Sequence, residues 1–136
     1  MNFDQLILGG EQFGLTDWGE ITFNELSKVF ESAMTKGFVE IDTSNIYGLG
    51  KSETNICLLK KRYDSDIEVS TKVGLHYTQE NENSRAKIYN DCSEKSIYTS
   101  VESSLKRLGL NNLHTVYIHY PDPKISINEC IKSLVK

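Results

Sequence analysis

The chain has 136 residues, of which 38% are hydrophobic and 25% are charged, as is ordinary for one globular domain. Its formal net charge of −4 argues against a general nucleic-acid binder, because no large basic patch offsets the acidic balance. No apolar stretch approaches the roughly 18 residues that a membrane-spanning helix needs, so we expect residues 1–136 to form one domain that binds neither nucleic acid nor membrane.

The first elements alternate between strand and helix. Residues 6–8 form a short apolar run closed by two glycines, which predicts a strand. Thr22, followed three residues later by Glu25, is typical of a capping box, and apolar residues then recur at helical spacing until Gly37. Residues 38–41 predict the second strand.

The alternation continues through the second half of the chain. A second helix begins at Ser52, and residues 67–71 predict a third strand. Residues 75–92 are polar with little periodicity, so we expect a long loop there. The third helix, the fourth strand and a fourth helix are predicted at residues 94–108, at residues 113–118 and from Ile127.

This order of elements predicts the fold class. Strands that alternate with helices of such length are typical of βαβ units and a parallel sheet. Four units are half the number in an eight-stranded (β/α)8 barrel of the TIM type. A half-barrel leaves one sheet face and two edge strands uncovered. We therefore expect an α/β fold with about the first four β/α units of a barrel, either truncated or self-associating through the exposed face.

The cysteines give information about the compartment. Cys57, Cys92 and Cys130 are odd in number and widely spaced. No Cys-x-x-Cys pair suggests a zinc site. The simplest interpretation is three reduced thiols in a cytoplasmic protein.

Four polar residues lie at, or just past, the ends of predicted strands. Asp42, Lys72 and His119 each follow an apolar run directly, and Tyr47 lies in the loop beyond Asp42. In a parallel α/β barrel the carboxyl ends of the strands carry the chemistry. Each of the four has a structural explanation when taken alone, but their joint occurrence at one set of strand ends favours a common site.

An acid, a phenol, an amine and an imidazole suit proton transfer to a carbonyl oxygen. Tyr47 can donate the proton, and an ammonium such as that of Lys72 within about 4–6 Å favours the phenolate left behind. The carboxylate of Asp42 would hold that ammonium in place, while His119 can bind the carbonyl oxygen or share in proton transfer. Glu40 is on the same strand face as Asp42 and needs a partner that the sequence does not identify.

Two other kinds of site are less favoured. Strand alternation places His114 on the opposite face from His119, which argues against joint metal ligation and makes a metal-dependent hydrolase the weakest alternative. Residues 47–52 are similar to a phosphate-binding loop, but Asn45 stands where a P-loop has its first glycine. We therefore predict no metal site and no nucleoside-triphosphate site.

Several segments resemble motifs of the aldo-keto reductases. Residues 41–53 read IDTSNIYGLGKSE and resemble the signature DTA…YG.G.SE, and residues 70–74 read STKVG and resemble the TKVG strand. Residues 103–110 and 118–123 read SSLKRLGL and IHYPDP, and are similar to SL.RLG…IH.PDP. These segments occur in the family's order along nearly the whole chain, so the match is specific; residues 8–14 fit more loosely.

The resemblance implies a (β/α)8 barrel that reduces aldehydes and ketones with NADPH or NADH. It places the family's proton-relay tetrad on Asp42, Tyr47, Lys72 and His119. It also implies that Gly10, Phe13 and Asp42 contact the cofactor. The STKVG strand and residues 90–93 are similar to members that act on free sugars, so the expected substrates include a sugar or sugar-derived carbonyl.

The sequence also departs from the family. Its members usually exceed twice this length, and their cofactor pocket takes most of its contacts from the second half of the barrel: a Ser-Asn pair, a Gln and a basic phosphate grip. None of these is in the present sequence. Two functions therefore stay open at this point: a carbonyl-reducing enzyme, and a catalytically inactive truncated half-barrel that acts as a binding or assembly module.

Overall fold

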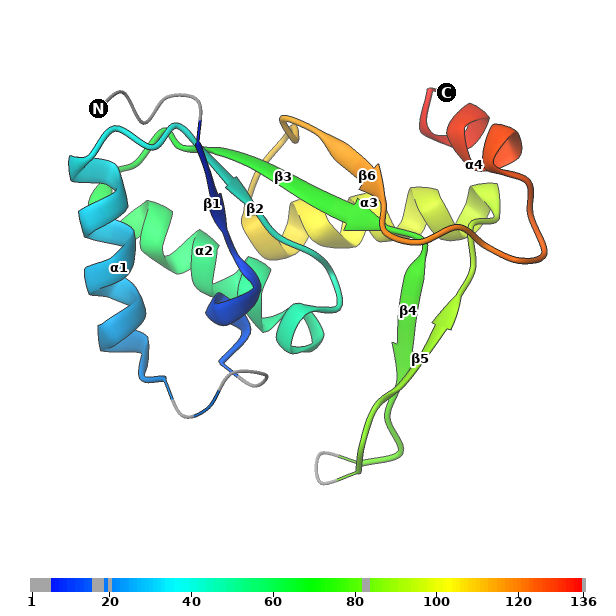
Figure 1. The fold of residues 1–136 in the computed structure, drawn as a ribbon, viewed down its shortest axis with the longest axis horizontal. Helices are drawn as coiled ribbons and strands as arrows, with labels where there is room; N and C mark the ends of the chain where they lie inside the picture. Colours follow the sequence, from blue (N-terminus) through cyan, green and yellow to red (C-terminus); the bar gives the residue numbers. More distant parts are fainter. Residues whose placement is uncertain (1–5, 16–18, 20, 82–83, 136) are drawn as a thin grey trace.

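A computed structural model describes residues 6–15, 19, 21–81 and 84–135. Its main sheet is parallel, with the strand order β1-β2-β3-β6 (Figure 1). These strands are β1 (Ile7–Gly9), β2 (Glu40–Asp42), β3 (Glu68–Val73) and β6 (Val116–Ile118). They alternate with the helices α1 (Phe23–Thr35), α2 (Lys51–Tyr63), α3 (Glu94–Leu108) and α4 (Ile127–Leu134). The predicted parallel α/β arrangement with four β/α units is confirmed.

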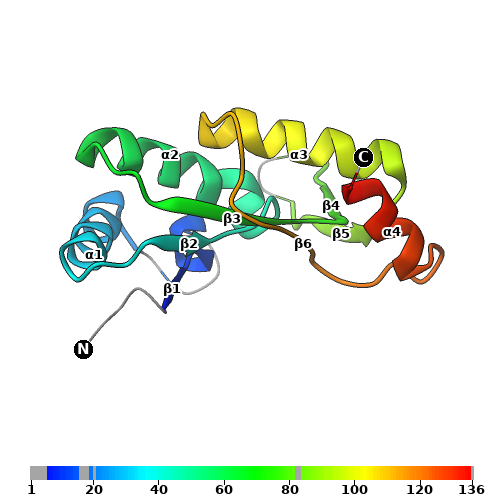
Figure 2. The same cartoon turned by 90° about the horizontal axis from the view of Figure 1, so that it is seen from above.

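The two faces of this sheet differ in how deeply their side chains are buried by other elements. On one face, called here the covered face, Ile41, Val69 and Val73 are at most 2% exposed. Figure 2 shows α2 and α3 lying along one side of β3. On the opposite face, called here the open face, Ile7 is 50% and Tyr117 is 44% exposed. The sheet has β1 and β6 as its edges in the described part of the chain, so it is open, as a partial barrel must be.

Helix starts follow the local sequence. The capping box predicted at Thr22 and Glu25 is confirmed, since the Thr22 hydroxyl accepts from the Glu25 N–H and the Glu25 carboxylate accepts from the Thr22 N–H. The fourth helix begins at the predicted Ile127, after a second capping box formed by Ser126 and Glu129. Such caps satisfy backbone N–H groups that have no partner within the helix.

The long loop predicted at residues 75–92 is wrong. This segment contains an antiparallel hairpin of β4 (Leu75–Thr78) and β5 (Lys87–Asn90), which projects from the main sheet (Figure 1). Tyr77, Ile88 and Tyr89 are all more than a third exposed. Apart from Leu75, which is buried, the strands of the hairpin are mostly exposed, so their sequence lacks the apolar alternation of a half-buried strand.

The placement of His114 on the face opposite His119 is also wrong. Strand β6 begins only at Val116, so the two-residue alternation does not extend back to residue 114. The His114 ring lies 2.8 Å from a Glu68 carboxylate oxygen and 3.8 Å from one of Glu40, which belongs to the open face. The Ser70 hydroxyl also donates to Glu40, so the missing partners of that carboxylate are Ser70 and His114.

The three cysteines, Cys57, Cys92 and Cys130, are buried and unbridged. Burial and contact with the Cys130 thiol raise the pKa of Cys92 to about 12. In the described residues, no helix combines the length and the apolar character that crossing a bilayer requires.

Candidate active site

The ammonium of Lys72 joins three parts of the predicted site. Its Nζ atom lies 2.6 Å from Asp42 Oδ2 and 3.0 Å from the Tyr47 hydroxyl oxygen. A third bond, of 2.9 Å, reaches the backbone carbonyl of Thr43. A lysine ammonium has three protons, and these contacts use all of them. The phenol and the ammonium, which are distant in sequence, are therefore adjacent in space.

Strand register explains why Asp42 and Lys72 meet. Asp42 pairs with Ser70, and Lys72 lies two residues further along the same face of β3. The last residue of β2 is Asp42, as expected, but β3 continues through Lys72 to Val73, so the lysine lies inside its strand and not beyond it. Both side chains are on the open face. The long side chain of Lys72 can therefore bring its ammonium back toward the end of β2, where Asp42 lies.

A hollow of about 360 Å³ lies beside this ion pair. It is lined by Ile7, Gly9, Asp42, Lys72 and Tyr117. Gly9 is directly opposite Asp42 in the sheet, and a Cβ built there would meet no atom within 4 Å, so the missing side chain helps to make the space. Asp42 Oδ1 is buried and has no hydrogen-bond partner among the described residues. Asp42 thus lines the hollow and keeps one buried carboxylate oxygen without a partner in the described part of the chain.

Tyr47 is positioned by two glycines. It opens the short 3-10 turn η2 (Tyr47–Gly50), which packs against η1 (Glu11–Gly14). A Cβ on Gly48 would lie 2.3 Å from the carbonyl oxygen of Gly14, and a Cβ on Gly14 would lie 2.6 Å from the Gly48 nitrogen. Gly48 also has a φ of +56°, which L side chains rarely adopt. Backbone contact between these turns therefore fixes the chain at Tyr47.

His119 completes the group from the end of β6. Its backbone N–H donates to the Val73 carbonyl at 2.9 Å, which continues the sheet pairing by one residue. Its ring meets the Tyr47 ring edge-on, with 5.7 Å between centroids, and its Nδ1 lies 3.1 Å from Ser44 Oγ. Burial lowers the pKa of His119, the Lys72 charge lowers it further, and Asp42 opposes both. The neutral imidazole is the form that this environment favours.

The residues expected to contact a cofactor lie in different surroundings. The Gly10 N–H donates to the Asp42 carbonyl at 2.7 Å, and a Cβ on Gly10 would lie 2.6 Å from that oxygen. Gly10 is therefore next to the site. The Phe13 side chain is 1% exposed and belongs to the main hydrophobic core, so the structure does not bring its ring to the hollow.

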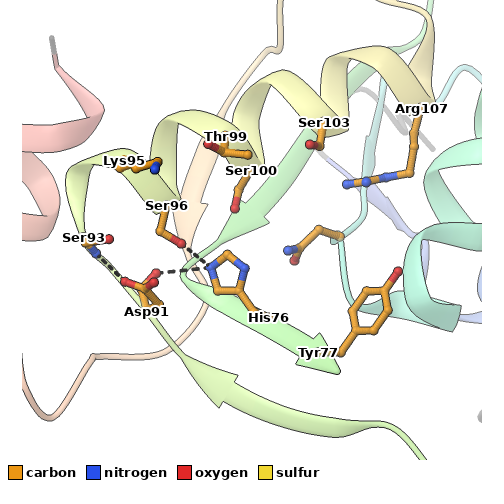
Figure 3. Close-up of a pocket in the computed structure, with 11 residues that line it drawn as sticks. His76, Tyr77, Asp91, Ser93, Lys95, Ser96, Thr99, Ser100, Ser103 and Arg107 are labelled. Atoms are coloured by element: carbon orange, nitrogen blue, oxygen red, sulfur yellow. Dashed lines mark hydrogen bonds between the residues drawn. The ribbon is translucent and has the colours of Figure 1, made fainter. Parts of the chain in front are cut away.

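A second cleft, of about 370 Å³, lies between the hairpin and α3 (Figure 3). His76, Tyr77, Ser96 and Arg107 are among its lining residues, and none of the four predicted site residues is. Asn45 also lines it. In the described residues no cluster of three or more His, Cys, Asp or Glu side chains is arranged to hold a metal ion. The cleft is thus separate from the residues of the predicted chemistry.

Sequence reasoning missed the residues that support the site. Thr43 and Ser44 were not among the residues singled out from the sequence, yet they contact Lys72 and His119 respectively. Their position directly after Asp42 was a signal of proximity to the site. Their partners lie 29 and 75 residues away in the chain, so no local pattern could identify them.

Comparisons with known proteins identify the family. The model of the Aldo/keto reductase family matches residues 5–136, so the chain belongs to this family. It is 32% identical to norsolorinic acid reductase B of Aspergillus parasiticus and 29% identical to the aldo-keto reductase YhdN of Bacillus subtilis, over 95% and 90% of its own length. Among solved structures, the glycerol dehydrogenase of Gluconobacter oxydans is 32% identical and has a TM-score of 0.81 over 94% of this chain.

These relatives are much longer than the present chain. It spans 35% of the Aspergillus protein, 36% of the Bacillus protein and 39% of the Gluconobacter chain. The similar solved structures are (β/α)8 barrels of aldo-keto reductases, so the fold predicted from the sequence is confirmed for the part present here.

Proposed function

From this family membership we propose that the chain supplies the proton-transfer group of an oxidoreductase that reduces an aldehyde or ketone with NADPH or NADH. The observation that supports it most directly is the Lys72 ammonium, which contacts both the Asp42 carboxylate and the Tyr47 hydroxyl. An ammonium bound to a phenol stabilises the phenolate that forms when the phenol gives up its proton. The four side chains thereby act as one unit on a carbonyl oxygen.

Each residue has one task in the proposed reaction. A nicotinamide cofactor, when bound, supplies hydride to the carbonyl carbon. The Tyr47 hydroxyl gives its proton to the carbonyl oxygen, and Lys72, at 3.0 Å, holds the resulting phenolate. Asp42 holds Lys72 in place through a contact of 2.6 Å. His119, with its ring against that of Tyr47, orients the substrate oxygen.

The open face fits the reacting end of such a cofactor. The hollow beside Gly9 offers about 360 Å³ next to Lys72, and Asp42, which also lines it, has a buried oxygen, Oδ1, without a partner in the described part of the chain. A hydroxyl or amide donor of a bound cofactor would satisfy that oxygen. Gly10, whose N–H binds the Asp42 carbonyl, keeps the adjoining backbone close to the same place.

The substrate class and the compartment are further parts of the proposal. We expect the carbonyl to include sugars or sugar-derived compounds, on the similarity of residues 70–74 and 90–93 to sugar-reducing members. One similar solved protein is named a glycerol dehydrogenase, which is compatible with a polar substrate. Three unbridged cysteines accord with a cytoplasmic location.

Replacement of one hydroxyl tests the proposal in the complete barrel. Tyr47→Phe should lower kcat by about 10²–10⁴-fold, the usual contribution of a general acid, while the affinity for NADPH stays nearly unchanged. Tyr98→Phe is the matched control, because Tyr98 is 65% exposed on α3 and remote from the site. Equal turnover of Tyr47→Phe and the control would reject the role assigned to Tyr47.

A second candidate is a non-catalytic module that assembles with a second copy of this chain. The open edges at β1 and β6, with Ile7 and Tyr117 exposed between them, favour it. Two copies related by a twofold axis could pair β1 with β6 in both directions and close an eight-stranded ring. Sedimentation gives the oligomeric state, and NADPH titration followed by fluorescence gives cofactor binding. A dimer that does not bind NADPH would favour the module over the enzyme.

A further inference from the structure

The cleft between the hairpin and α3 has two walls of different chemistry. It measures about 370 Å³, at the small end of the range of about 300–1,000 Å³ for small-molecule sites. The wall from α3 presents side chains at spacings of three and four residues, which share one helix face: Ser96, Ser100, Ser103 and Arg107. The opposite wall is the hairpin, which brings the rings of His76 and Tyr77 to the same space (Figure 3).

The Ser100 hydroxyl is the group that points most directly to a ligand. Ser100 is 6% exposed, and its side chain points from α3 toward the hairpin (Figure 3). Its hydroxyl makes no hydrogen bond within the part of the chain that the structure describes. Because polar groups buried to this extent nearly always have a partner, we expect the partner of this hydroxyl to come from the cleft that it lines.

His76 offers an acceptor on the other wall. Its Nε2 atom lies 3.2 Å from the Asp91 backbone carbonyl oxygen and 2.8 Å from Ser96 Oγ. That carbonyl only accepts, so Nε2 carries the proton of the neutral ring and Nδ1 keeps a lone pair. Figure 3 shows Nδ1 on the cleft side of the ring. A ligand that fits both walls must therefore donate to His76 and exchange a hydrogen bond with Ser100.

The rings of the hairpin wall are held in place by their own contacts. The Tyr77 hydroxyl donates to the Leu49 carbonyl at 3.0 Å. The His76 ring stacks on the Tyr89 ring, with 5.5 Å between centroids. A wall that is already ordered costs less conformational entropy when a ligand binds.

The charges around the cleft balance, so they do not select an anion. Arg107 Nε donates at 2.5 Å to the carboxylate of Glu53, which is 0% exposed. At the opposite end, Lys95 and Asp91 supply one charge of each sign (Figure 3). A charged ligand would therefore gain little net attraction, whereas an uncharged molecule with several hydroxyls matches the hydroxyls, the lone pair and the aromatic wall.

We propose that this cleft binds a small uncharged polyhydroxylated molecule, of the class of monosaccharides and polyols. One hydroxyl of such a molecule would donate to His76 Nδ1, another would bond with Ser100, and its C–H groups would pack on the Tyr77 ring. None of the four predicted site residues lines the cleft, so this is a second site, and its existence does not depend on the proposed function.

The test is a titration of the ¹⁵N-labelled chain with methyl α-D-glucopyranoside, followed by amide ¹H–¹⁵N correlation spectra. This probe has no free carbonyl and is therefore not a substrate for carbonyl reduction. We expect saturable shifts at residues 76–77 and 96–107, with a dissociation constant of about 1–10 mM, as is usual for a weakly bound small ligand. Shifts that do not saturate, or that centre on residues 42–47 and 72, would overturn the proposal. Tighter binding of gluconate, the anionic probe, at the same residues would overturn the assignment of an uncharged ligand.

One hydroxyl separates this site from nonspecific binding of the probe. Ser100→Ala should weaken binding by about 3–10-fold, the usual contribution of one hydrogen bond. Ser32→Ala is the matched control, because Ser32 is an exposed helical serine on α1, and should leave the affinity unchanged. Equal affinities of the two variants would contradict the proposal. If Ser100→Ala does not fold, the position and saturation of the shifts in the parent chain decide.

Discussion

The two faces of the sheet are stabilised by different interactions. On the covered face, Ile41 and Val73 are fully buried in apolar clusters. On the open face, polar pairs replace apolar contacts, as in Lys72 with Asp42 and Ser70 with Glu40. The strands are the same, so the contrast arises from alternate residues alone. Apolar burial on one face stabilises the fold, and the other face is thereby free to place charges for chemistry.

The largest expected effect contrasts two isoleucines on neighbouring strands. Ile41→Ala removes a side chain that is 0% exposed on the covered face, so the free energy of unfolding should fall by about 2–5 kcal/mol. Ile7→Ala is the matched change on the open face, where the side chain is 50% exposed, and should cost about 0.5 kcal/mol or less. Urea denaturation of both variants checks this. Equal losses of unfolding free energy would mean that the Ile7 side chain is also packed against other groups in solution.

A buried charge on the covered side gives a slightly smaller effect. Glu53 is 0% exposed; it accepts from Arg107 Nε at 2.5 Å and from the Thr71 hydroxyl at 2.8 Å. Glu53→Gln removes the charge but keeps the shape, and should cost about 3 kcal/mol, because Arg107 loses its partner but is 31% exposed. The double variant with Arg107→Gln, measured by the same denaturation, should recover part of the loss. Strictly additive losses would show that the two groups are not coupled.

The smallest effect concerns protons on the open face. The pKa of His119 is lowered by burial and by Lys72, so between the folded and unfolded pKa values the unfolded chain binds more protons. Its contribution to stability is therefore present above the unfolded value of about 6.5 and is lost as pH falls through that value toward the folded one. The free energy of unfolding should drop less between neutral and mildly acidic pH in His119→Gln than in the parent chain. Parallel pH profiles would contradict the lowered pKa.

The fold was largely readable from the sequence because its signals are local. The capping box at Thr22 and the apolar runs that end at Asp42 and His119 depend on neighbours in the chain. The hairpin β4–β5 was missed because its exposed residues carry no burial pattern. The failure at His114 has a similar cause, since strand parity was extended beyond the first residue of β6.

The candidate site was readable only in part. The four side chains Asp42, Tyr47, Lys72 and His119 were named from strand ends and from a family resemblance, and the structure brings them together. Their catalytic roles stay predictions. The hydrogen bond between Ser44 and His119 was not visible, because a contact with a residue 75 positions away depends on tertiary structure. The expected contact of Phe13 with a cofactor came from the family resemblance, which does not reveal that the side chain is buried in the core.

The meeting of Gly14 and Gly48 has a consequence for reading mutations in this protein. Neither residue has a side chain, and neither takes part in any chemistry, yet a methyl group on either would push apart η1 and η2, the turn that carries the phenol. An alanine at one of these positions would thus behave like damage to the reactive tyrosine itself. Surveys of inactivating substitutions would then find a hotspot where no functional group exists, and the explanation would be the lack of space between two stretches of backbone.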